Sequence, residues 1–455
     1  MECTQSFTAL LSEFRCVFTQ PSWQIFLCLM TGWVLSHRRR FVTELIWSSG
    51  CTRRGHHSRY HNFFGKSVWK LDNLSWVLAK LLVAVFAPVG IIELGVDDTL
   101  CRKRGLMVYG TGMHHDPLIS SRAKPLTSWG HDWVVVTLIV RNPFWASTKV
   151  WSLPIAFRLY RNRQGLTKGK KKARPSKKRT QDPNHRTRPQ LATELIGLVA
   201  GWFGERMLLV SGDSAYGGQS VLGPLPANVD LISHVHPKGA LYEPAPAPTP
   251  NQKGRHRKKG RRLPGMAAWA DDPSQPWQTL LFDQFGLHAT LRVKTRKALY
   301  YKAGKDRLLT IVLVRDVLGK RPDQRFYCTR LDWEARQILS AYAARWSIEV
   351  TFENSKQLLG LQDPANRTEK AVRRTAPMAL VLYSLIVLWF HQEGHRHLRF
   401  PERPWYRRKQ EPSFADLLTT LRRVSWQEKF RTVPLSGGHA KKHLASILEF
   451  LSLAG

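Results

Sequence analysis

Two kinds of hydrophobic pattern alternate along the chain. Runs rich in β-branched and aromatic residues predict strands over 90–99, 131–140, 150–160, 206–213 and 229–235. Pro154 lies inside the third run, and a strand accepts proline mainly at an edge, a bulge or a bend. We therefore expect a bulge or bend at that point.

Helical spacing of apolar residues marks other segments. It predicts a mostly helical region over 1–80, a helix over 189–204, a long helix over about 333–360, a buried helix over 376–391 and a basic helical tail to residue 455. Asp332 has a side chain that suits a helix N-cap, and Gly360 suits the residue that follows a helix. We expect these two residues to bound the long helix.

The region 239–330 differs in composition from its surroundings. It opens with "EPAPAPTP" (243–250), which is typical of a stiff polyproline linker, and continues with the basic run "QKGRHRKKGRR" (252–262). Alternating apolar and polar residues then predict strands over 277–283, 288–294, 308–316 and 325–329. The region is therefore expected to be a mainly β insertion.

This order of elements predicts an α/β fold with a mixed sheet flanked by helices. The expected regions are a helical N-terminal region 1–80, a catalytic core in two parts, 81–238 and 331–400, the insertion 239–330 between them, and a helical C-terminal region 401–455. The N-terminal region is interpreted either as a DNA-binding region or as a helical cap with a solvated face. Within the core, the loop 161–188 contains "TKGKKKARPSKKR" and should become ordered only when phosphates bind.

The net charge of the chain indicates what kind of partner it binds. Lys and Arg number 70 against 33 Asp and Glu, which gives a net charge of +37. Such a chain repels itself unless a polyanion neutralises it, and phosphate contacts by Lys and Arg supply most non-specific affinity for nucleic acid. An anionic membrane surface is the alternative. The composition favours nucleic acid.

Cysteines and apolar runs add two expectations. The six cysteines are scattered without a CxxC pair, which favours free thiols in a reducing cytoplasm. The apolar stretches 22–35, 81–92 and 378–390 are each shorter than the roughly 20 residues of a membrane span, and no signal peptide is evident. We expect core elements and no membrane.

The segment "YAARWSIEVTFENSK" (342–356) places an acid among cations. Helical spacing puts Tyr342, Arg345, Glu349 and Lys356 on one face of the predicted helix. The simplest interpretation is an i, i+4 ion pair between Arg345 and Glu349. The other is a functional acid.

Further acids follow two predicted strands. Asp97 and Asp98 end the first strand, and Asp213 ends the strand before "SAYGG". Each alone suits a turn cap. Because the carboxyl ends of adjacent strands form the ligand crevice of an open α/β sheet, these acids and Glu349 can meet there. Clustered carboxylates suit hard cations such as Mg²⁺ or Mn²⁺, and two such ions can activate water and stabilise the leaving oxygen of a phosphodiester.

These motifs carry a resemblance to a known family. The segment 342–356 fits Y-x2-R-x3-E-x6-K, and the strands "LGVDDT" and "LLVSGDSAYGG" precede it in order. The chain thus resembles the large cut-and-paste group of bacterial insertion-sequence transposases, whose DDE catalytic domain has a ribonuclease H-like fold. The resemblance spans roughly 90–390. The interval of 136 residues (349 − 213) leaves room for the β insertion that such enzymes carry.

The resemblance implies roles for named residues. Asp97, Asp213 and Glu349 would be the catalytic acids and would bind two Mg²⁺ or Mn²⁺ ions; Thr99 at +2 favours Asp97 over Asp98 as the first acid. Tyr342, Arg345 and Lys356 would contact DNA phosphates near the cleaved end. Trp269 and Trp277 are candidates for stacking a flipped base, with a core aromatic as the alternative.

The implied function is a transposase of bacterial cytoplasm, associated with the nucleoid. It would bind the terminal inverted repeats of its own element in double-stranded DNA, cleave by metal-activated water and join the 3′-OH ends to target DNA, as a homodimer in the DNA complex. Two alternatives stay open. One is a catalytically inactive or domesticated DNA-binding relative, and the other is a metal-dependent nuclease of the same fold without strand transfer.

Overall fold

The structure is a computed structural model. It describes residues 3–121, 123–162, 185–247, 256–284, 287–319, 321–401, 407–430, 447–448 and 451. Most of the basic loop 161–188 lies outside the described residues, so the expectation for it stays a prediction. The expected helical C-terminal region 401–455 is described in part, and its described part contains a helix over Phe414–Phe430.

Five helices form the N-terminal region, as the hydrophobic spacing predicted. They are α1 (Gln5–Ser12), α2 (Gln20–Leu35), α3 (Val42–Ser48), α4 (Ser58–Gly65) and α5 (Leu71–Phe86). Their apolar faces share one continuous core with the sheet and with the helices after residue 368. The indole nitrogen of Trp33 in α2, for example, donates to the carbonyl of Leu359 at 2.7 Å.

Ten strands form one mixed sheet in the described part of the chain. They are β1 (Ile92–Arg102), β2 (Gly112–His115), β3 (Thr127–Arg141), β4 (Val150–Tyr160), β5 (Leu208–Gly212), β6 (Val229–His234), β7 (Gln278–Gln284), β8 (Leu287–Leu299), β9 (Leu308–Asp316) and β10 (Gln324–Cys328). The order is β2-β3-β1-β5-β6-β10-β9-β8-β7, with β4 beside β3. β5 is parallel to β1 and β6, and the other pairs are antiparallel.

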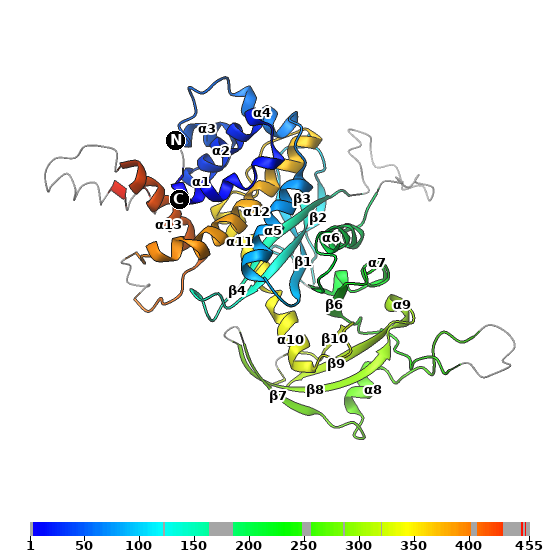
Figure 1. Cartoon of the computed structure of the whole chain (residues 1–455). Coiled ribbons are helices and arrows are strands. Elements are labelled where there is room, and N and C mark those ends of the chain that lie inside the picture. Colours follow the sequence, from blue (N-terminus) through cyan, green and yellow to red (C-terminus); the bar gives the residue numbers. More distant parts are fainter. Residues whose placement is uncertain are drawn as a thin grey trace.

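The predicted β insertion extends this same sheet. β10 pairs with β6 antiparallel, so the strands of the insertion continue the core sheet at its edge. Figure 1 shows them below the body of the molecule, with the short helices α8 (Met266–Asp271) and α9 (Tyr301–Gly304) beside them. The buried Lys294 ammonium of β8 donates to three carbonyls around the end of α8, including that of Trp269 at 2.9 Å.

Helices cover the sheet. They are α6 (Arg188–Trp202), α7 (Gln219–Leu222), α10 (Ala335–Ala344), α11 (Ser347–Leu358), α12 (Glu369–Gln392) and α13 (Phe414–Phe430). Among the described helices, α12 has the length and apolar composition of a membrane span, but 94% of its apolar window is buried inside the protein. This agrees with the core helix expected around 376–391, which begins earlier than predicted, at Glu369.

Strand details confirm one prediction and correct another. The β3–β4 register shifts beside Pro154, as expected for a proline in a strand. β1, however, does not end at its aspartate pair. It continues to Arg102, because β3 keeps pairing with it after its pairing with β5 has stopped at Val96.

The cysteine prediction is wrong for one pair. Cys28 of α2 and Cys51, after α3, form a disulfide, because α3 folds back on α2 and brings their Cα atoms to 6.6 Å. The other four cysteines, Cys3, Cys16, Cys101 and Cys328, are free thiols.

Candidate active site

Strand register brings two of the predicted acids together. β1 and β5 run parallel, and their last paired residues are Val96 and Gly212. Asp97 and Asp213 are the next residue on each strand, so they lie side by side where the two strands part. Asp213 caps the short 3-10 helix Ser214–Tyr216 and accepts from the backbone N–H of Ala215 at 2.8 Å.

A glycine lets the third acid approach. Gly95 shares the face of β1 that carries Asp97, and a Cβ atom at Gly95 would lie 2.5 Å from Cδ1 of Ile348 in α11. The absence of that Cβ allows the first turn of α11, which contains Glu349, to rest on β1. Ser347 adds a second contact between α11 and the sheet, because its hydroxyl lies 2.5 Å from that of Ser152 in β4.

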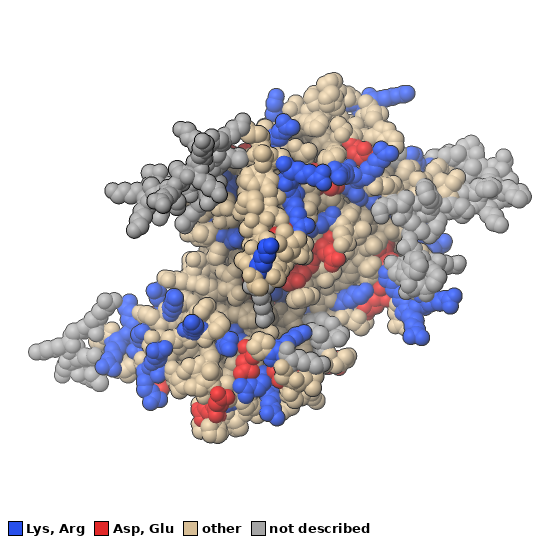
Figure 2. Space-filling model, turned by 180° about the vertical axis from the view of Figure 1, so that it is seen from behind, with Lys and Arg blue, Asp and Glu red and all other residues tan. Residues whose placement is uncertain are grey.

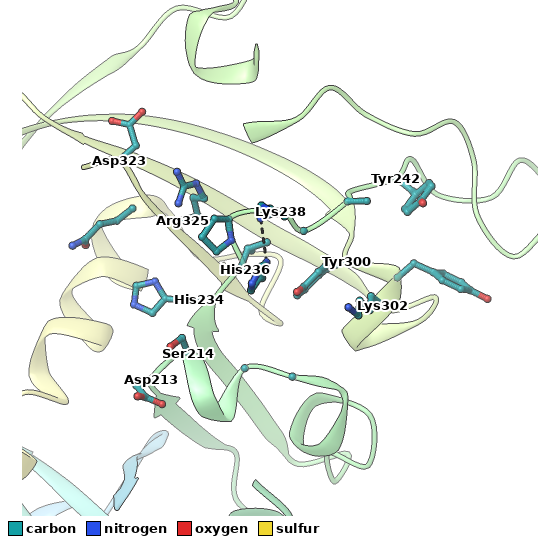
Figure 3. Close-up of a pocket in the computed structure, with 18 of the residues that line it drawn as sticks. Asp213, Ser214, His234, His236, Lys238, Tyr242, Tyr300, Lys302, Asp323 and Arg325 are labelled. Atoms are coloured by element: carbon teal, nitrogen blue, oxygen red, sulfur yellow. Dashed lines mark hydrogen bonds between the residues drawn. The ribbon is translucent and has the colours of Figure 1, made fainter. Parts of the chain in front are cut away.

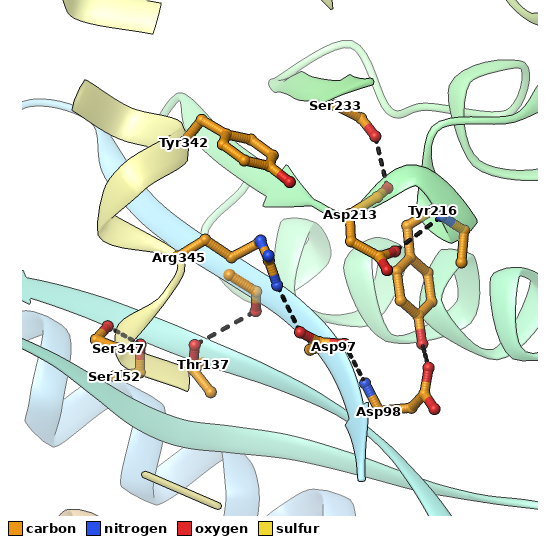
Figure 4. A network of polar contacts seen from close by, with 12 residues as sticks. Asp97, Asp98, Thr137, Ser152, Asp213, Tyr216, Ser233, Tyr342, Arg345 and Ser347 are labelled. Carbon is orange, nitrogen blue, oxygen red and sulfur yellow. Dashed lines mark hydrogen bonds and ion pairs between the residues drawn. The ribbon is translucent and has the colours of Figure 1, made fainter. Parts of the chain in front are cut away.

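Arg345 lies at the centre of the cluster. It is 7% exposed, and its Nη1 donates to Oδ2 of Asp97 at 2.5 Å. Its guanidinium lies 5.3 Å from the centre of the Tyr342 ring, and the Tyr342 hydroxyl is 2.7 Å from Nε2 of His234. Figure 4 shows Asp97, Asp213 and Tyr342 around the end of the arginine side chain.

The carboxylates repel one another. Burial raises the pKa of Asp97 to about 7, and the charges of Asp213 and Asp98 add to this effect although Arg345 opposes it. Burial also raises the pKa of Glu349, and Asp213 again adds to the rise. The site therefore holds more negative charge than Arg345 neutralises, in a chain whose net charge is +37.

The neighbouring Asp98 faces the other side of the sheet, because side chains alternate along a strand. Its Oδ1 accepts from the Tyr216 hydroxyl at 2.6 Å, and its Oδ2 lies 3.4 Å from Nε of Arg188. Arg188 also pairs with the buried Asp132 of β3. Sequence reasoning missed both Arg188 and Asp132; the only signal for Asp132 was an acid at the start of an apolar strand.

The predicted long helix is two helices. α10 ends at Ala344 and α11 begins at Ser347, with a tight turn at Arg345 and Trp346, whose N–H groups donate three residues back to Tyr342 and Ala343. The break turns Arg345 toward Asp97 rather than into the i, i+4 pair with Glu349 that the simplest interpretation required.

The expected ends of this helix meet different outcomes. Glu334, not Asp332, is the N-cap, because Gln337 accepts from the Glu334 backbone N–H at 3.0 Å while Asp332 pairs with Arg330. At the other end the expectation is confirmed. Gly360 has a φ of +63°, a conformation that favours glycine.

The surroundings of three other predicted residues are also described. Lys356 is in the last turn of α11, within electrostatic range of Cys101 of β1 and of Asp132 of β3. Trp269 is 1% exposed, and the Arg296 guanidinium lies 3.9 Å from the centre of its ring. Trp277 donates to the Ala270 carbonyl at 3.1 Å. The core interpretation of both tryptophans fits these contacts.

The oxygen atoms of the three acids are ligands of the kind that hard divalent cations prefer. Asp97, Asp213 and Glu349 offer only carboxylate oxygens. The pKa values of Asp97 and Glu349 are raised, and a bound divalent ion would lower them by favouring the ionised carboxylates. Among the described residues, no group of three or more His, Cys, Asp and Glu side chains is already arranged to hold one ion. Instead, one carboxylate oxygen of Asp97 is paired with the Arg345 guanidinium.

These features define an α/β protein with an acidic site at the parting of parallel strands. The chain belongs to the DDE superfamily endonucleases, since the model of that family matches residues 13–303, well over half of its 455 residues. The match contains Asp97 and Asp213 and ends before α10. Enzymes of this superfamily generally depend on divalent metal ions.

Other comparisons add little. No curated protein matches the chain. Among solved structures, a piggyBac transposase synaptic complex with hairpin DNA is similar at 12% identity and a TM-score of 0.37, over 98% of this chain and 81% of that one.

Proposed function

We propose that this chain is a DNA transposase of the bacterial insertion-sequence group with the Y-x2-R-x3-E-x6-K signature. Asp97, Asp213 and Glu349 are its catalytic acids. The observation that supports this most is the β1–β5 register, which sets Asp97 beside Asp213 while α11 rests on Gly95. The antiparallel strands β1, β3 and β4, followed by α6 and the parallel strands β5 and β6, support a ribonuclease H-like core.

The proposed chemistry uses the three carboxylates to hold Mg²⁺ or Mn²⁺, and bound ions of this kind supply Lewis acidity to a phosphodiester and an activated water. Arg345 then has two partners available, the Asp97 carboxylate in the free protein and a DNA phosphate in the complex. Tyr342 lies beside Arg345 and would contact the same strand. Double-stranded DNA fits the basic surface, and Figure 2 shows Lys and Arg around a hollow that contains acids.

The test is cleavage of labelled duplexes that carry the inverted repeats flanking the reading frame, in Mg²⁺. We expect Glu349→Gln to bind these ends like the wild type and to lose cleavage by at least about 100-fold, since it removes one metal-binding charge. Glu353→Gln is the matched control, because Glu353 is an exposed acid one turn along α11. Normal cleavage by Glu349→Gln contradicts the assignment.

The same assay separates the alternatives. Joined products on a target plasmid support a transposase, cleavage without joining indicates a nuclease of the same fold, and binding without cleavage by the wild type indicates an inactive relative.

A further inference from the structure

A large cavity opens directly beside the candidate active site. Its volume is about 890 Å³, and Asp213 and Tyr342 form part of its wall. From there it passes His234 and Lys238 toward Tyr242 in the insertion (Figure 3). A pocket of this size is within the range for separate small ligands, roughly 300–1,000 Å³, and is too small for a length of double helix.

The wall of the cavity is basic. Lys238, Lys259, Lys302 and Arg325 line it together with two histidines. Apart from Asp213, the acid in the wall is Asp323, which is already engaged by Arg315 at 2.7 and 3.0 Å and so does not offset these cations.

One of these cations is the guanidinium of Arg325, which is among the residues that line the cavity. Its planar fork of N–H donors matches the oxygens of a phosphate. The wall therefore suits an anion.

Aromatic faces lie at the far end. The Tyr242 and Tyr301 rings are 6.4 Å apart, and Nζ of Lys259 lies 3.8 Å from the first ring centre and 4.9 Å from the second. Both tyrosines are half-buried and line the cavity, so part of each side chain can be reached from it. Tyrosine faces next to cations are the combination that binds unpaired bases, because every base has a π-face and every nucleotide a phosphate.

We propose that this cavity binds an unpaired DNA strand that leads away from the scissile phosphate. Lys238, Lys302 and Arg325 contact its phosphates, and Tyr301 with Tyr242 stacks its bases. The inference rests on the proposed function, since it identifies the form of DNA held beside the cleavage site. It differs from the tryptophan prediction, because Trp269 and Trp277 are absent from the residues that line this cavity.

The experiment measures the Kd of the full-length protein for a fluorescein-labelled oligothymidylate by fluorescence anisotropy, in EDTA. We expect Tyr301→Ala to weaken binding roughly 5- to 100-fold, as for the loss of one base-stacking contact, and Tyr301→Phe to bind like the wild type. Lys238→Ala/Lys302→Ala should weaken binding and reduce the salt slope by about 1.4, or roughly 0.7 per lost phosphate contact.

The matched control is Arg292→Ala/Lys297→Ala, which removes two exposed cations from β8 outside this cavity and should leave binding close to wild type. Thermal unfolding first shows that Tyr301→Ala and Lys238→Ala/Lys302→Ala are folded. The inference is overturned if these folded variants bind the oligothymidylate as tightly as the wild type. It is also overturned if they weaken a blunt duplex by the same factor as the oligothymidylate.

The assay contains no metal and needs no cleavage, so its result is separate from that of the proposed function. Loss of cleavage in Glu349→Gln supports the proposed function, and weaker oligothymidylate binding by Tyr301→Ala and by Lys238→Ala/Lys302→Ala supports the proposal for the cavity. An inactive wild type that still shows these effects of Tyr301 and the lysines overturns the function alone.

Discussion

Asp97 shows how one side chain depends on its surroundings. Its carboxylate is paired with Arg345 at 2.5 Å, yet burial and the neighbouring charges of Asp213 and Asp98 keep its pKa at about 7. The ionised form of Asp97 is therefore disfavoured in the folded protein without metal. A cation that binds there relieves this repulsion, which couples metal binding to proton release.

A prediction follows for the protein in EDTA. A folded-state pKa raised above the ordinary 3.8 means that the penalty is absent below pH 4, grows as the pH rises and is complete above pH 7. Asp97→Asn should therefore gain stability relative to the wild type between pH 4 and pH 8, by an amount on the order of 2–4 kcal/mol. Urea unfolding at several pH values measures the difference.

A pH-independent difference between Asp97→Asn and the wild type would contradict the raised pKa. Glu353→Gln is the control, because Glu353 is an exposed acid of the same helix.

At the scale of elements, the break between α10 and α11 decides the geometry of the site. A continuous helix would carry Arg345 and Glu349 on one face, whereas the turn at Arg345 directs the guanidinium to β1. Contacts that hold α11 on the sheet include its packing on Gly95, the contact of the Ser347 and Ser152 hydroxyls, and the hydrogen bond from Thr351 to the Ser152 carbonyl at 2.8 Å.

The packing at Gly95 gives a second prediction. Gly95→Ala places a methyl group 2.5 Å from Cδ1 of Ile348 and should lower the free energy of unfolding by about 1–3 kcal/mol, with loss of cleavage as α11 moves. Ile348→Val removes that Cδ1 atom, so Gly95→Ala/Ile348→Val should recover most of the loss. Urea unfolding and cleavage assays of the four proteins form a double-mutant cycle.

Additive effects in that cycle would show that Gly95 and Ile348 do not meet. The distance to Thr137, which would be 3.1 Å from the new methyl group, sets how complete the recovery can be.

On the scale of the whole molecule, one sheet joins the core and the insertion. The strands from β7 to β10 continue the sheet through β6, so the cavity beside Asp213 has walls from both parts. Excess positive charge surrounds this acidic centre. Such a distribution attracts a phosphate backbone to the surface while leaving the negative centre for cations.

The charge gives a third prediction, which concerns salt. Affinity of the wild type for any duplex should fall about 10³-fold or more between 50 and 200 mM salt, as for proteins that make roughly six to ten phosphate contacts. Titrations with an unrelated duplex, followed by anisotropy, measure the slope. A change below tenfold would show that few of the cations reach DNA.

The sequence by itself determined most of the secondary-structure elements and the candidate acids. Its hydrophobic patterns located the strands from β1 to β10 except β2, most helices and the acids Asp97, Asp213 and Glu349, because period-2 and period-3.6 spacing are local properties. It also predicted the bulge at Pro154.

Only the tertiary structure decided how the pieces meet. Whether Asp97 or Asp98 faces α11 depends on the register of β1 with β3 and β5, which no local pattern contains. The helix break at Arg345, the Cys28–Cys51 disulfide and the cavity beside Asp213 arise from contacts between segments far apart in the chain. Such contacts depend on packing shape, which the order of residues specifies only through the whole fold.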